Sequence, residues 1–300
     1  MNEDVSPRSR IGFLGLGLMG QPMAANLSLS GTPLMVWNRT SGKTERIVEA
    51  GATVAIDIDA IFDACETLVM MLATPAAIDE VLGRGGPQFK QRLQGRLIIN
   101  TGTASPEYSS ALAADIRAVG GRYVEAPVSG SRKPAEERQL VAMVAGDPAD
   151  VAVARRLLGP ICRETFDCGP VPGGLRMKLA VNLFMIVMVT GLVETFHFAE
   201  RANIDANALR DVLAVTPMAN PVSQVKAAKL AAQDWAPQAA LADVLKNVDL
   251  ILDETGAASA ATPLIETCRR LYGQAVALDR GTFDMVAVQA AYTHLTGTRP

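Results

Sequence analysis

Residues 10–27 read RIGFLGLGLMGQPMAANL, and this stretch decides the fold. A short apolar run enters a turn with three glycines, and the turn opens directly into a helix with apolar periodicity. Gly15 permits a tight turn, Gly17 lets the backbone approach a pyrophosphate, and Gly20 allows the helix to pack closely on the strand. The stretch predicts a dinucleotide-binding βαβ unit, although a flexible turn before an ordinary helix would look similar. We expect the cofactor to contact the whole loop: Gly15, Leu16, Gly17, Leu18, Met19 and Gly20.

The segment after the second predicted strand, Leu34–Trp37, indicates which dinucleotide binds. An NAD site usually has an acidic residue there, which binds the ribose 2′-hydroxyl. This chain instead has Asn38, Arg39 and Thr40, followed by Lys43. A guanidinium with small amide and hydroxyl donors suits a 2′-phosphate, so the segment favours NADP(H) over NAD(H). The alternative is a solvated loop.

The composition is that of a globular protein. Of 300 residues, 49% are hydrophobic and 20% are charged, which is enough apolar material for two domains or one large one. The formal net charge of −3 favours a small molecule as partner over nucleic acid or an anionic membrane surface. The start of the chain lacks the apolar core of a secretory signal. We therefore expect a cytoplasmic protein.

Cysteine and histidine are scarce, and we expect no metal site. The two histidines, His197 and His294, lie far apart in the sequence and have no neighbouring ligand pattern. The cysteines lack zinc-binding spacing and are expected to be buried, reduced thiols: Cys65, Cys162, Cys168 and Cys268.

Short apolar runs alternate with helical stretches in the first half of the chain. This alternation predicts a Rossmann-type, doubly wound and mainly parallel sheet. After the second strand, the predicted strands are Thr67–Leu72, Leu97–Asn100, Arg122–Glu125, Leu140–Ala145 and Glu164–Cys168. The predicted helices after the first are Ser41–Ala50, Pro75–Leu82, Pro106–Ala118 and Pro148–Leu158.

A glycine- and proline-rich segment at residues 169–174 ends this pattern and marks a domain boundary. We predict an NADP-binding Rossmann domain over residues 1–172 and an all-helical substrate and dimerisation domain over residues 173–300. The helical domain is built on one long helix, Leu175–Ala202. Further helices are predicted at Asp205–Val215, Ser223–Ala231, Leu241–Thr255, Pro263–Tyr272 and Phe283–Thr293.

The long helix is apolar on nearly every side between residues 179 and 196. A membrane span needs about 20 apolar residues, whereas this run contains Asn182, Thr190 and Gly191 and is bounded by Lys178 and Glu194. We therefore expect burial by the rest of the chain and by a second subunit, in a homodimer or homotetramer formed through this helix, rather than a membrane span.

Two polar residues at the start of the long helix are candidates for chemistry. Lys178 and Asn182 are four residues apart, so a helix places both side chains on one face. A lysine at a buried position has a lowered pKa and can protonate a carbonyl oxygen that becomes an alkoxide as hydride arrives. The asparagine would orient the lysine or the substrate. A solvated lysine beside a surface asparagine is the alternative.

The segment at residues 125–136 follows a strand and cannot continue it. It therefore forms a loop at the carboxyl edge of the sheet, where ligands of such sheets bind. Ser129, Gly130 and Ser131 could hold a substrate carboxylate with backbone N–H groups and a hydroxyl. A plain serine-glycine turn is the alternative.

Five blocks in this order resemble the β-hydroxyacid dehydrogenase (3-hydroxyisobutyrate dehydrogenase-like) family, and most of all its NADPH-dependent glyoxylate and succinic semialdehyde reductases. The blocks are GFLGLGLMGQPMAANL (12–27), WNRT (37–40), MLATP (71–75), EAPVSGSRKPAE (125–136) and GLRMKLAVN (174–182). The resemblance implies that Lys178 is the catalytic acid and base, that Asn182 is its partner, and that Ser129 to Ser131 bind the substrate. It also implies that Leu72, Ala73 and Thr74 contact the cofactor and that the dimer forms through the long helix.

The chain departs from the resembled family at three places. Thr101-Gly102-Thr103 replaces a pair of hydroxyl residues near the nicotinamide, Ala239 aligns with a pocket phenylalanine, and Lys246-Asn247 replaces a Lys-Asp pair. By position, Gly102 and Lys246 belong with the cofactor and Asn247 with the substrate. Loss of the ring enlarges the site, and the asparagine removes a charge and adds a donor.

The sequence therefore predicts a reductase that transfers hydride from NADPH to the carbonyl group of a small carboxylic acid, or catalyses the reverse reaction. An imine reductase with an enlarged pocket is a second hypothesis, although such enzymes usually have Asp or Tyr in place of Lys178. A non-catalytic NADP-binding subunit is a third hypothesis.

Overall fold

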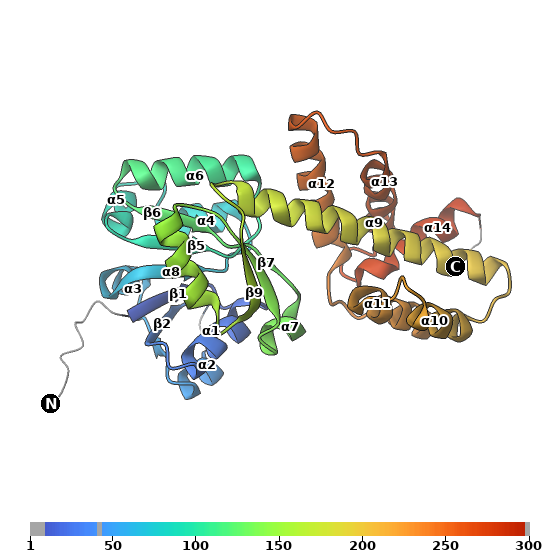
Figure 1. The fold of residues 1–300 in the computed structure, drawn as a ribbon, viewed down its shortest axis with the longest axis horizontal. Coiled ribbons are helices and arrows are strands. Elements are labelled where there is room, and N and C mark those ends of the chain that lie inside the picture. The colour runs from blue at the N-terminus through green and yellow to red at the C-terminus, as the bar shows by residue number, and fades with distance from the viewer. Residues whose placement is uncertain (1–9, 41–43, 298–300) are drawn as a thin grey trace. The chain divides into compact units, whose positions relative to one another are not determined.

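The computed structural model describes residues 10–40 and 44–297. Lys43, which the sequence assigns to the cofactor, lies outside the described residues. Contacts within the chain divide it into two compact units, residues 1–178 and 179–300. Helix α9 (Gly173–Arg201) begins in the first unit and continues into the second (Figure 1). The division falls inside this helix, six residues after the boundary expected from sequence, because its first turns hydrogen-bond to the first unit.

The first unit contains the predicted parallel sheet. Six parallel strands lie in the order β3-β2-β1-β4-β5-β6, so the chain crosses from one side of β1 to the other. This is the doubly wound order, and it confirms the Rossmann-type fold class. The strands are β1 (Arg10–Leu14), β2 (Leu34–Trp37), β3 (Thr53–Val54), β4 (Cys65–Met70), β5 (Leu97–Asn100) and β6 (Arg122–Glu125).

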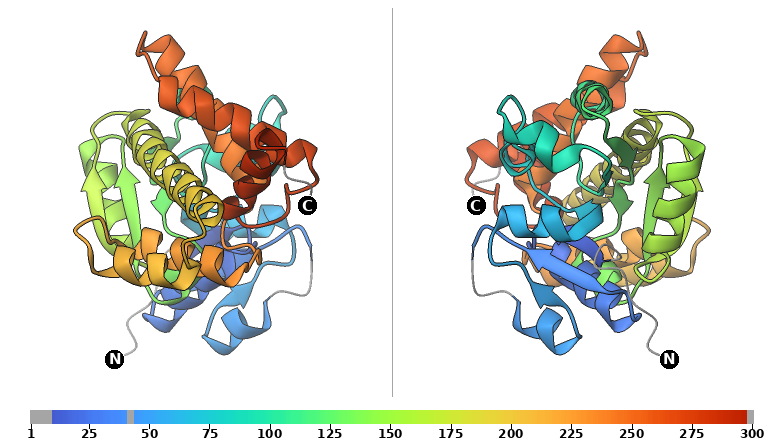
Figure 2. Two further views of the ribbon diagram at one scale, coloured as in Figure 1. Left: turned by 90° about the vertical axis from the view of Figure 1, so that its right-hand side faces the viewer. Right: turned by 90° about the vertical axis from the view of Figure 1, so that its left-hand side faces the viewer.

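Helices cover both faces of this sheet (Figures 1 and 2). Successive side chains of a strand point to opposite faces, so the strand residues alternate between two hydrophobic cores, one under each layer of helices. In β4, Val69 belongs to one core, whereas Leu68 and Met70 belong to the other. Thr74, Ser105 and Asp147 each cap a helix that continues with proline. The helices are α1 (Gly20–Leu29), α2 (Glu45–Glu49), α3 (Ile58–Ala64), α4 (Pro75–Leu82), α5 (Gln88–Leu93), α6 (Pro106–Ala118), α7 (Arg132–Glu136) and α8 (Pro148–Leu158).

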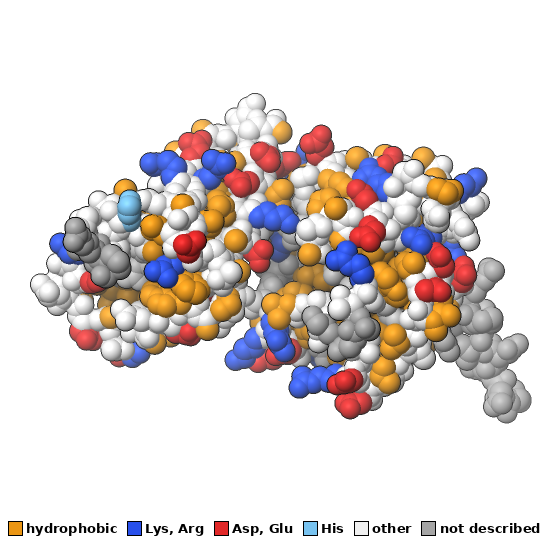
Figure 3. Space-filling model, turned by 180° about the vertical axis from the view of Figure 1, so that it is seen from behind, with side chains coloured by type: hydrophobic (Ala, Val, Ile, Leu, Met, Phe, Trp, Pro, Cys, Tyr) orange, Lys and Arg blue, Asp and Glu red, His pale blue; other side chains and the backbone are white. Residues whose placement is uncertain are grey.

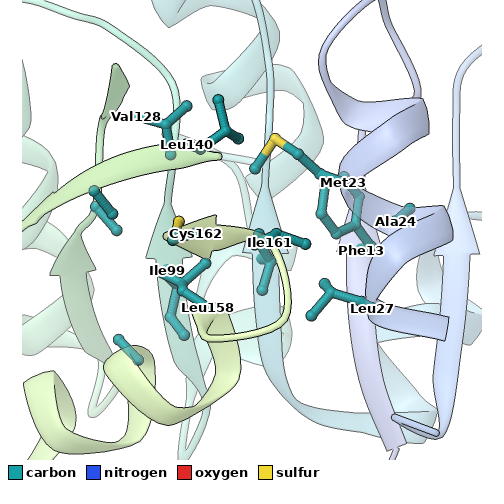
Figure 4. Packing of buried hydrophobic residues seen from close by; sticks show 14 of the residues in the cluster. Phe13, Met23, Ala24, Leu27, Ile99, Val128, Leu140, Leu158, Ile161 and Cys162 are labelled. Carbon is teal, nitrogen blue, oxygen red and sulfur yellow. The ribbon is translucent and has the colours of Figure 1, made fainter. Parts of the chain in front are cut away.

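Two predicted strands belong to a separate sheet rather than to the parallel one. This sheet has the order β7-β8-β9 and contains β7 (Val128–Ser129), β8 (Leu140–Val144) and β9 (Cys162–Asp167). The prediction that β8 and β9 belong to the main parallel sheet was therefore wrong. The strand after the edge strand β6 is β7, which pairs antiparallel with β8 rather than with β6. This pairing begins the second sheet. Figure 4 shows residues of this sheet, such as Leu140 and Cys162, packed in one core with Phe13 of β1 and Met23 of α1.

The regular elements among the described residues of the second unit are helices, with one isolated bridge between Ala240 and Asp284. Its elements are the rest of α9, then α10 (Ala206–Val215), α11 (Pro221–Ala232), α12 (Leu241–Ala257), α13 (Pro263–Ala277), a 3₁₀ turn η1 (Met285–Val288) and α14 (Gln289–Leu295). One hydrophobic core joins them. By length and composition α9 could cross a membrane, and 33% of its most apolar window is buried within the chain. Figure 3 shows basic and acidic side chains interspersed over the visible face, with hydrophobic side chains between them.

Candidate active site

The glycine loop after β1 has the geometry that a dinucleotide requires. Gly15 has a φ of +97°, and a Cβ there would collide with the carbonyl of Met71. A Cβ at Gly20 would collide with the carbonyl of Gly15. At Gly17, by contrast, a Cβ would meet no atom within 4 Å, so the backbone borders open space. Close packing therefore requires glycine at positions 15 and 20, whereas Gly17 leaves room for a ligand.

The start of α1 is suited to an anion. No acidic residue lies in its first turn, and Met19 caps the helix without a side-chain hydrogen bond. The N–H of Leu16 donates to Asn38 Oδ1 at 2.9 Å, which ties the loop to the end of β2. Leu16 is buried, whereas Leu18 is exposed. The N–H groups, the local lack of negative charge and the space over Gly17 fit the pyrophosphate of a dinucleotide.

At the end of β2 the predicted residues divide into two roles. Both polar groups of Asn38 serve the loop itself, because Nδ2 donates to the carbonyl of Thr40 at 2.7 Å. Arg39 is exposed and pairs with the exposed Glu80 at 3.2 Å. Exposed pairs are weak, so a phosphate can replace the carboxylate. Arg39 and Thr40 are therefore the described residues available to a 2′-phosphate.

Gly102 lies where the loops after β4 and β5 meet. A Cβ there would be 2.9 Å from the carbonyl oxygen of Leu72 and 3.3 Å from Asn100 Oδ1. The approach of the two loops explains the glycine, which departs from the resembled family. Thr74 Oγ1 accepts a hydrogen bond from the N–H of Ala77 at 3.2 Å and so caps α4. Thr74 therefore also shapes the end of this loop.

The amine of Lys178 lies beside the predicted substrate loop. Nζ donates to the carbonyl oxygen of Val128 at 2.6 Å, and Val128 directly precedes Ser129. Lys178 is buried, and burial lowers the pKa of its amine to about 8. The structure thus brings together residues that are fifty positions apart in the sequence. An amine with this pKa can both give and take a proton near neutral pH.

The loop at residues 129–131 presents polar groups. Ser129 and Ser131 are half-buried, and Ser131 precedes α7 without using its side chain as a cap. Gly130 has a φ of +129°, and a Cβ there would lie 2.7 Å from Leu140 Cδ2. The turn therefore requires glycine. Two hydroxyls and the backbone around them could bind a carboxylate.

In the second unit, Asn182 hydrogen-bonds to Asn247. Nδ2 of Asn182 donates to Oδ1 of Asn247 at 3.0 Å, and Nδ2 of Asn247 donates to the carbonyl of Asp243 at 2.8 Å. Because that carbonyl can only accept, it determines the orientation of both amides. One of the two N–H donors that asparagine adds at position 247 is used within α12. The amide oxygen of Asn182 is left as the acceptor.

Two further predicted positions, Ala239 and Lys246, lie in the second unit. Ala239 is partly buried against the helical core, and its N–H lies 3.4 Å from Asp284 Oδ2. Lys246 is exposed on α12. Of the four cysteines, Cys168 is only half-buried, which corrects the expectation that all are buried.

Sequence reasoning missed the role of Glu125. This residue is 1% exposed, and its Oε2 accepts the N–H of Leu175 at 3.2 Å. An acidic residue at the end of an apolar strand was the available signal. It could not show that the side chain turns inward.

Comparisons with known proteins agree with this geometry. Residues 10–169 match the NAD binding domain of 6-phosphogluconate dehydrogenase, and residues 173–292 match the NAD-binding domain of NADP-dependent 3-hydroxyisobutyrate dehydrogenase. Glyoxylate/succinic semialdehyde reductase 1 of Arabidopsis thaliana is 33% identical over 279 residues, which are 93% of this chain and 96% of the reductase. Human cytokine-like nuclear factor N-PAC is 29% identical over 98% of this chain but only 53% of its own length.

A solved structure is also similar over the full length. The 3-hydroxyisobutyrate dehydrogenase of Mycobacterium tuberculosis, solved with L-serine, has a TM-score of 0.82 and 25% identity, covering 95% of this chain and 99% of that one. These matches accompany three features of this chain's own structure: the glycine loop, the doubly wound sheet and the long helix. The chain therefore belongs to the 3-hydroxyisobutyrate dehydrogenase-like family of NAD(P)-binding oxidoreductases.

Proposed function

We propose that this oxidoreductase is an NADPH-dependent reductase of small carboxylic acids that carry an aldehyde or ketone group. The same residues would catalyse the reverse oxidation of the hydroxyacid. The observation that carries the proposal is the buried amine of Lys178, 2.6 Å from the carbonyl of Val128 at the start of the Ser129–Ser131 loop. This arrangement places a proton donor beside a loop that would bind the substrate carboxylate.

The cofactor would lie on the glycine loop, with its pyrophosphate over Gly17 and its 2′-phosphate at Arg39 and Thr40. When bound, NADPH supplies hydride to the carbonyl carbon. The NADP-dependent enzyme named by the matching family domain supports the choice of NADPH. The exposed guanidinium of Arg39 and the lack of a carboxylate at the end of β2 also support it.

Lys178 acts in its protonated form during reduction. Its ammonium gives a proton to the carbonyl oxygen as that oxygen gains charge, and the amine takes the proton back during oxidation. Ser129 and Ser131 hold the carboxylate of the substrate. Asn182 lies one helical turn after Lys178 and presents an acceptor oxygen, which would orient the ammonium or the substrate.

A substrate panel tests the reaction. Purified protein with NADPH is offered glyoxylate, succinic semialdehyde, methylmalonate semialdehyde and a cyclic imine, and loss of NADPH is followed by absorbance. We expect turnover of at least one carbonyl acid and none of the imine. Turnover of the imine alone would identify an imine reductase. Tight NADPH binding without any turnover would contradict the proposal and favour a non-catalytic subunit.

The choice of NADPH is tested at Arg39. Arg39→Ala is expected to raise the KM for NADPH by about 10- to 100-fold, because a charge-assisted phosphate contact is lost. The KM for NADH should change little. Arg269→Ala, which removes an exposed arginine of the second unit, is the matched control. Equal changes for both cofactors would contradict the assignment of Arg39 to the 2′-phosphate.

We further propose a cytoplasmic homodimer, or a pair of such dimers, formed through α9. Phe184 and Phe198 on this helix are 69% and 64% exposed, which favours a covering partner of the same kind. The free cysteines are compatible with a reducing compartment. Light scattering in detergent-free buffer should give twice or four times the chain mass, whereas a monomer, or protein that needs detergent, would contradict this.

A further inference from the structure

A chain of buried polar side chains crosses the first unit from the end of β5 towards the start of α9. Gly102 N–H donates to Asn100 Oδ1 at 3.1 Å, and Asn100 Nδ2 donates to the hydroxyl of Tyr123 at 3.1 Å. That hydroxyl lies 2.9 Å from Ser109 Oγ. Glu125 follows Tyr123 on the same strand, two residues on. All four side chains are buried, although none of them is part of the chemistry proposed above.

The hydrogen bonds from Gly102 through Asn100 to Tyr123 have a defined direction. Asn100 uses its oxygen for Gly102, so it can only donate to Tyr123. Burial raises the pKa of Tyr123, so its hydroxyl keeps its proton, and either this hydroxyl or that of Ser109 can donate in the contact between them. Burial raises the pKa of Glu125, and Ser109 opposes this shift.

Glu125 in turn contacts the first turn of α9. Its Oε2 accepts the N–H of Leu175, one of the helix-start groups that have no partner within the helix. The other oxygen, Oε1, is buried with no hydrogen-bond partner among the described residues, so the contact to the helix depends on Oε2. A Cβ at Gly174 would lie 3.2 Å from Oε2 and 2.6 Å from the carbonyl of Met143. The helix therefore begins pressed against β6 and β8.

Two hydrogen bonds of equal sequence separation hold this end of α9. Leu175 contacts Glu125, and Lys178 contacts Val128, so both pairs are fifty residues apart. Three residues are about one helical turn. A shift of the helix start would therefore move the amine of Lys178 away from Val128 and from the substrate loop.

We propose that Glu125 is a positioning residue for Lys178: its carboxylate anchors the first turn of α9 through the N–H of Leu175, beside the buried polar group of Asn100, Tyr123 and Ser109. This inference rests on the proposed role of Lys178 as the proton donor. Through Gly102 the same group reaches the loop that lies against Leu72, on the predicted cofactor side.

The charges around Glu125 agree with this role. Burial raises its pKa, and the opposing effects come from Ser109, the N–H groups of Leu175 and Gly174, and the charge of Arg176. Tyr123 on β6 and Cys168 after β9 are the other titratable groups that interact with it. The contacts to the helix and to Ser109 favour the ionised carboxylate, against the larger effect of burial.

The test combines Glu125→Ala, Glu125→Gln and Ser109→Ala, with Glu136→Gln as an exposed-carboxylate control. Loosening of the helix start admits water to Lys178, whose pKa is lowered by burial. The alkaline limb of the pH profile for reduction should therefore move up from about 8. We expect Glu125→Ala to lower kcat by about 100-fold with an unchanged Kd for NADPH. Glu125→Gln, which keeps an acceptor oxygen, should recover much of this loss, and Ser109→Ala should lie between them.

Hydrogen exchange of the peptide covering residues 173–182 gives a readout that is independent of turnover. Faster exchange in Glu125→Ala than in Glu136→Gln is expected even if the wild type reduces none of the substrates, so failure of the proposed function is distinguishable. Normal exchange together with an unmoved limb and kcat would overturn the inference. If Glu125→Ala does not fold, the decision falls on Glu125→Gln and Ser109→Ala: a moved limb supports the inference, and an unmoved limb overturns it.

Discussion

The first unit of this protein buries Lys178 and the second buries Lys226, and these two lysines have different kinds of partner. Lys178 donates to a neutral backbone carbonyl, that of Val128. Lys226, on α11 of the second unit, contacts both carboxylate oxygens of Asp284 at 2.8 and 2.9 Å. Burial lowers the pKa of both amines, but only at Lys226 does a carboxylate oppose the shift.

The comparison shows how the partner of a buried amine directs its use. Without a carboxylate, the ammonium of Lys178 is held weakly and can give up its proton near neutral pH. At Lys226 the contacts to Asp284 favour the ammonium against the effect of burial, and the pair supports the fold. Asp284 also accepts the N–H of Gln238 at 2.9 Å, so it anchors the segment before α12.

The largest expected difference is in catalysis. Lys178→Met should lower kcat/KM by about 1,000-fold, because the proton donor is lost. Lys226→Met makes the same substitution in the other unit and should leave the turnover of each folded molecule nearly unchanged. Initial rates with NADPH, together with cofactor titration by fluorescence, measure both effects. Full activity of Lys178→Met would refute the assignment of the acid.

The order should be reversed for stability. Lys226→Met leaves the buried carboxylate of Asp284 without a counter-charge, and such losses cost about 3–5 kcal/mol. Lys178→Met leaves only a carbonyl unpaired, which costs about 1–3 kcal/mol and is offset by the removal of a buried charge. Urea unfolding of the two variants compares these losses. Equal losses would mean that the two lysines do not differ in role.

The pH dependence follows from the pKa of about 8 for Lys178. Reduction needs the ammonium, so kcat/KM should be constant below about pH 8 and fall about tenfold per unit above it; oxidation should show the opposite limb. Because the unfolded chain binds this proton up to its ordinary pKa of 10.5, the wild type should also gain stability as the pH rises from about 8 to 10.5. Lys178→Met should lack this gain, and a gain of the same size in that variant would assign it to another group.

The smallest effect is expected at a second pair on the same helix as Lys226. Lys229 contacts Asp234 at 2.7 Å, but the carboxylate side chain is 50% exposed. Solvent screens such a pair, so Asp234→Asn should not measurably change the urea midpoint. A loss as large as that of Lys226→Met would show that burial of both partners is not what distinguishes the pairs.

Much of the first unit could be predicted from local patterns. The glycine loop, the alternating strands and the capped helices are encoded within short windows, so the parallel sheet and α9 were predicted correctly. The position of β8 and β9 in a separate sheet was not, because strand pairing depends on contacts far apart in the chain. The short elements β3, α3 and α5 carry too few residues for a periodic signal.

The candidate site shows the same limit at the level of single residues. Motif spacing predicted Lys178, Asn182 and the loop at 129–131, but not which atoms meet. The sequence indicated Asn247 as an added donor, but not that one of its N–H groups donates to the carbonyl of Asp243. Glu125 is the first residue of the EAPVSGSRKPAE block, and nothing in the sequence indicated its contact to α9.

The amino-acid sequence by itself determined the dinucleotide-binding turn, the order of the longer strands and helices, and the residue types available for proton transfer, because these depend on neighbours a few positions away. Only the tertiary structure decided which buried lysine meets a carbonyl and which meets a carboxylate. Lys226 and Asp284 are 58 residues apart, and Lys178 and Val128 are 50. Burial and charge pairing, which set a pKa, arise from contacts across that distance.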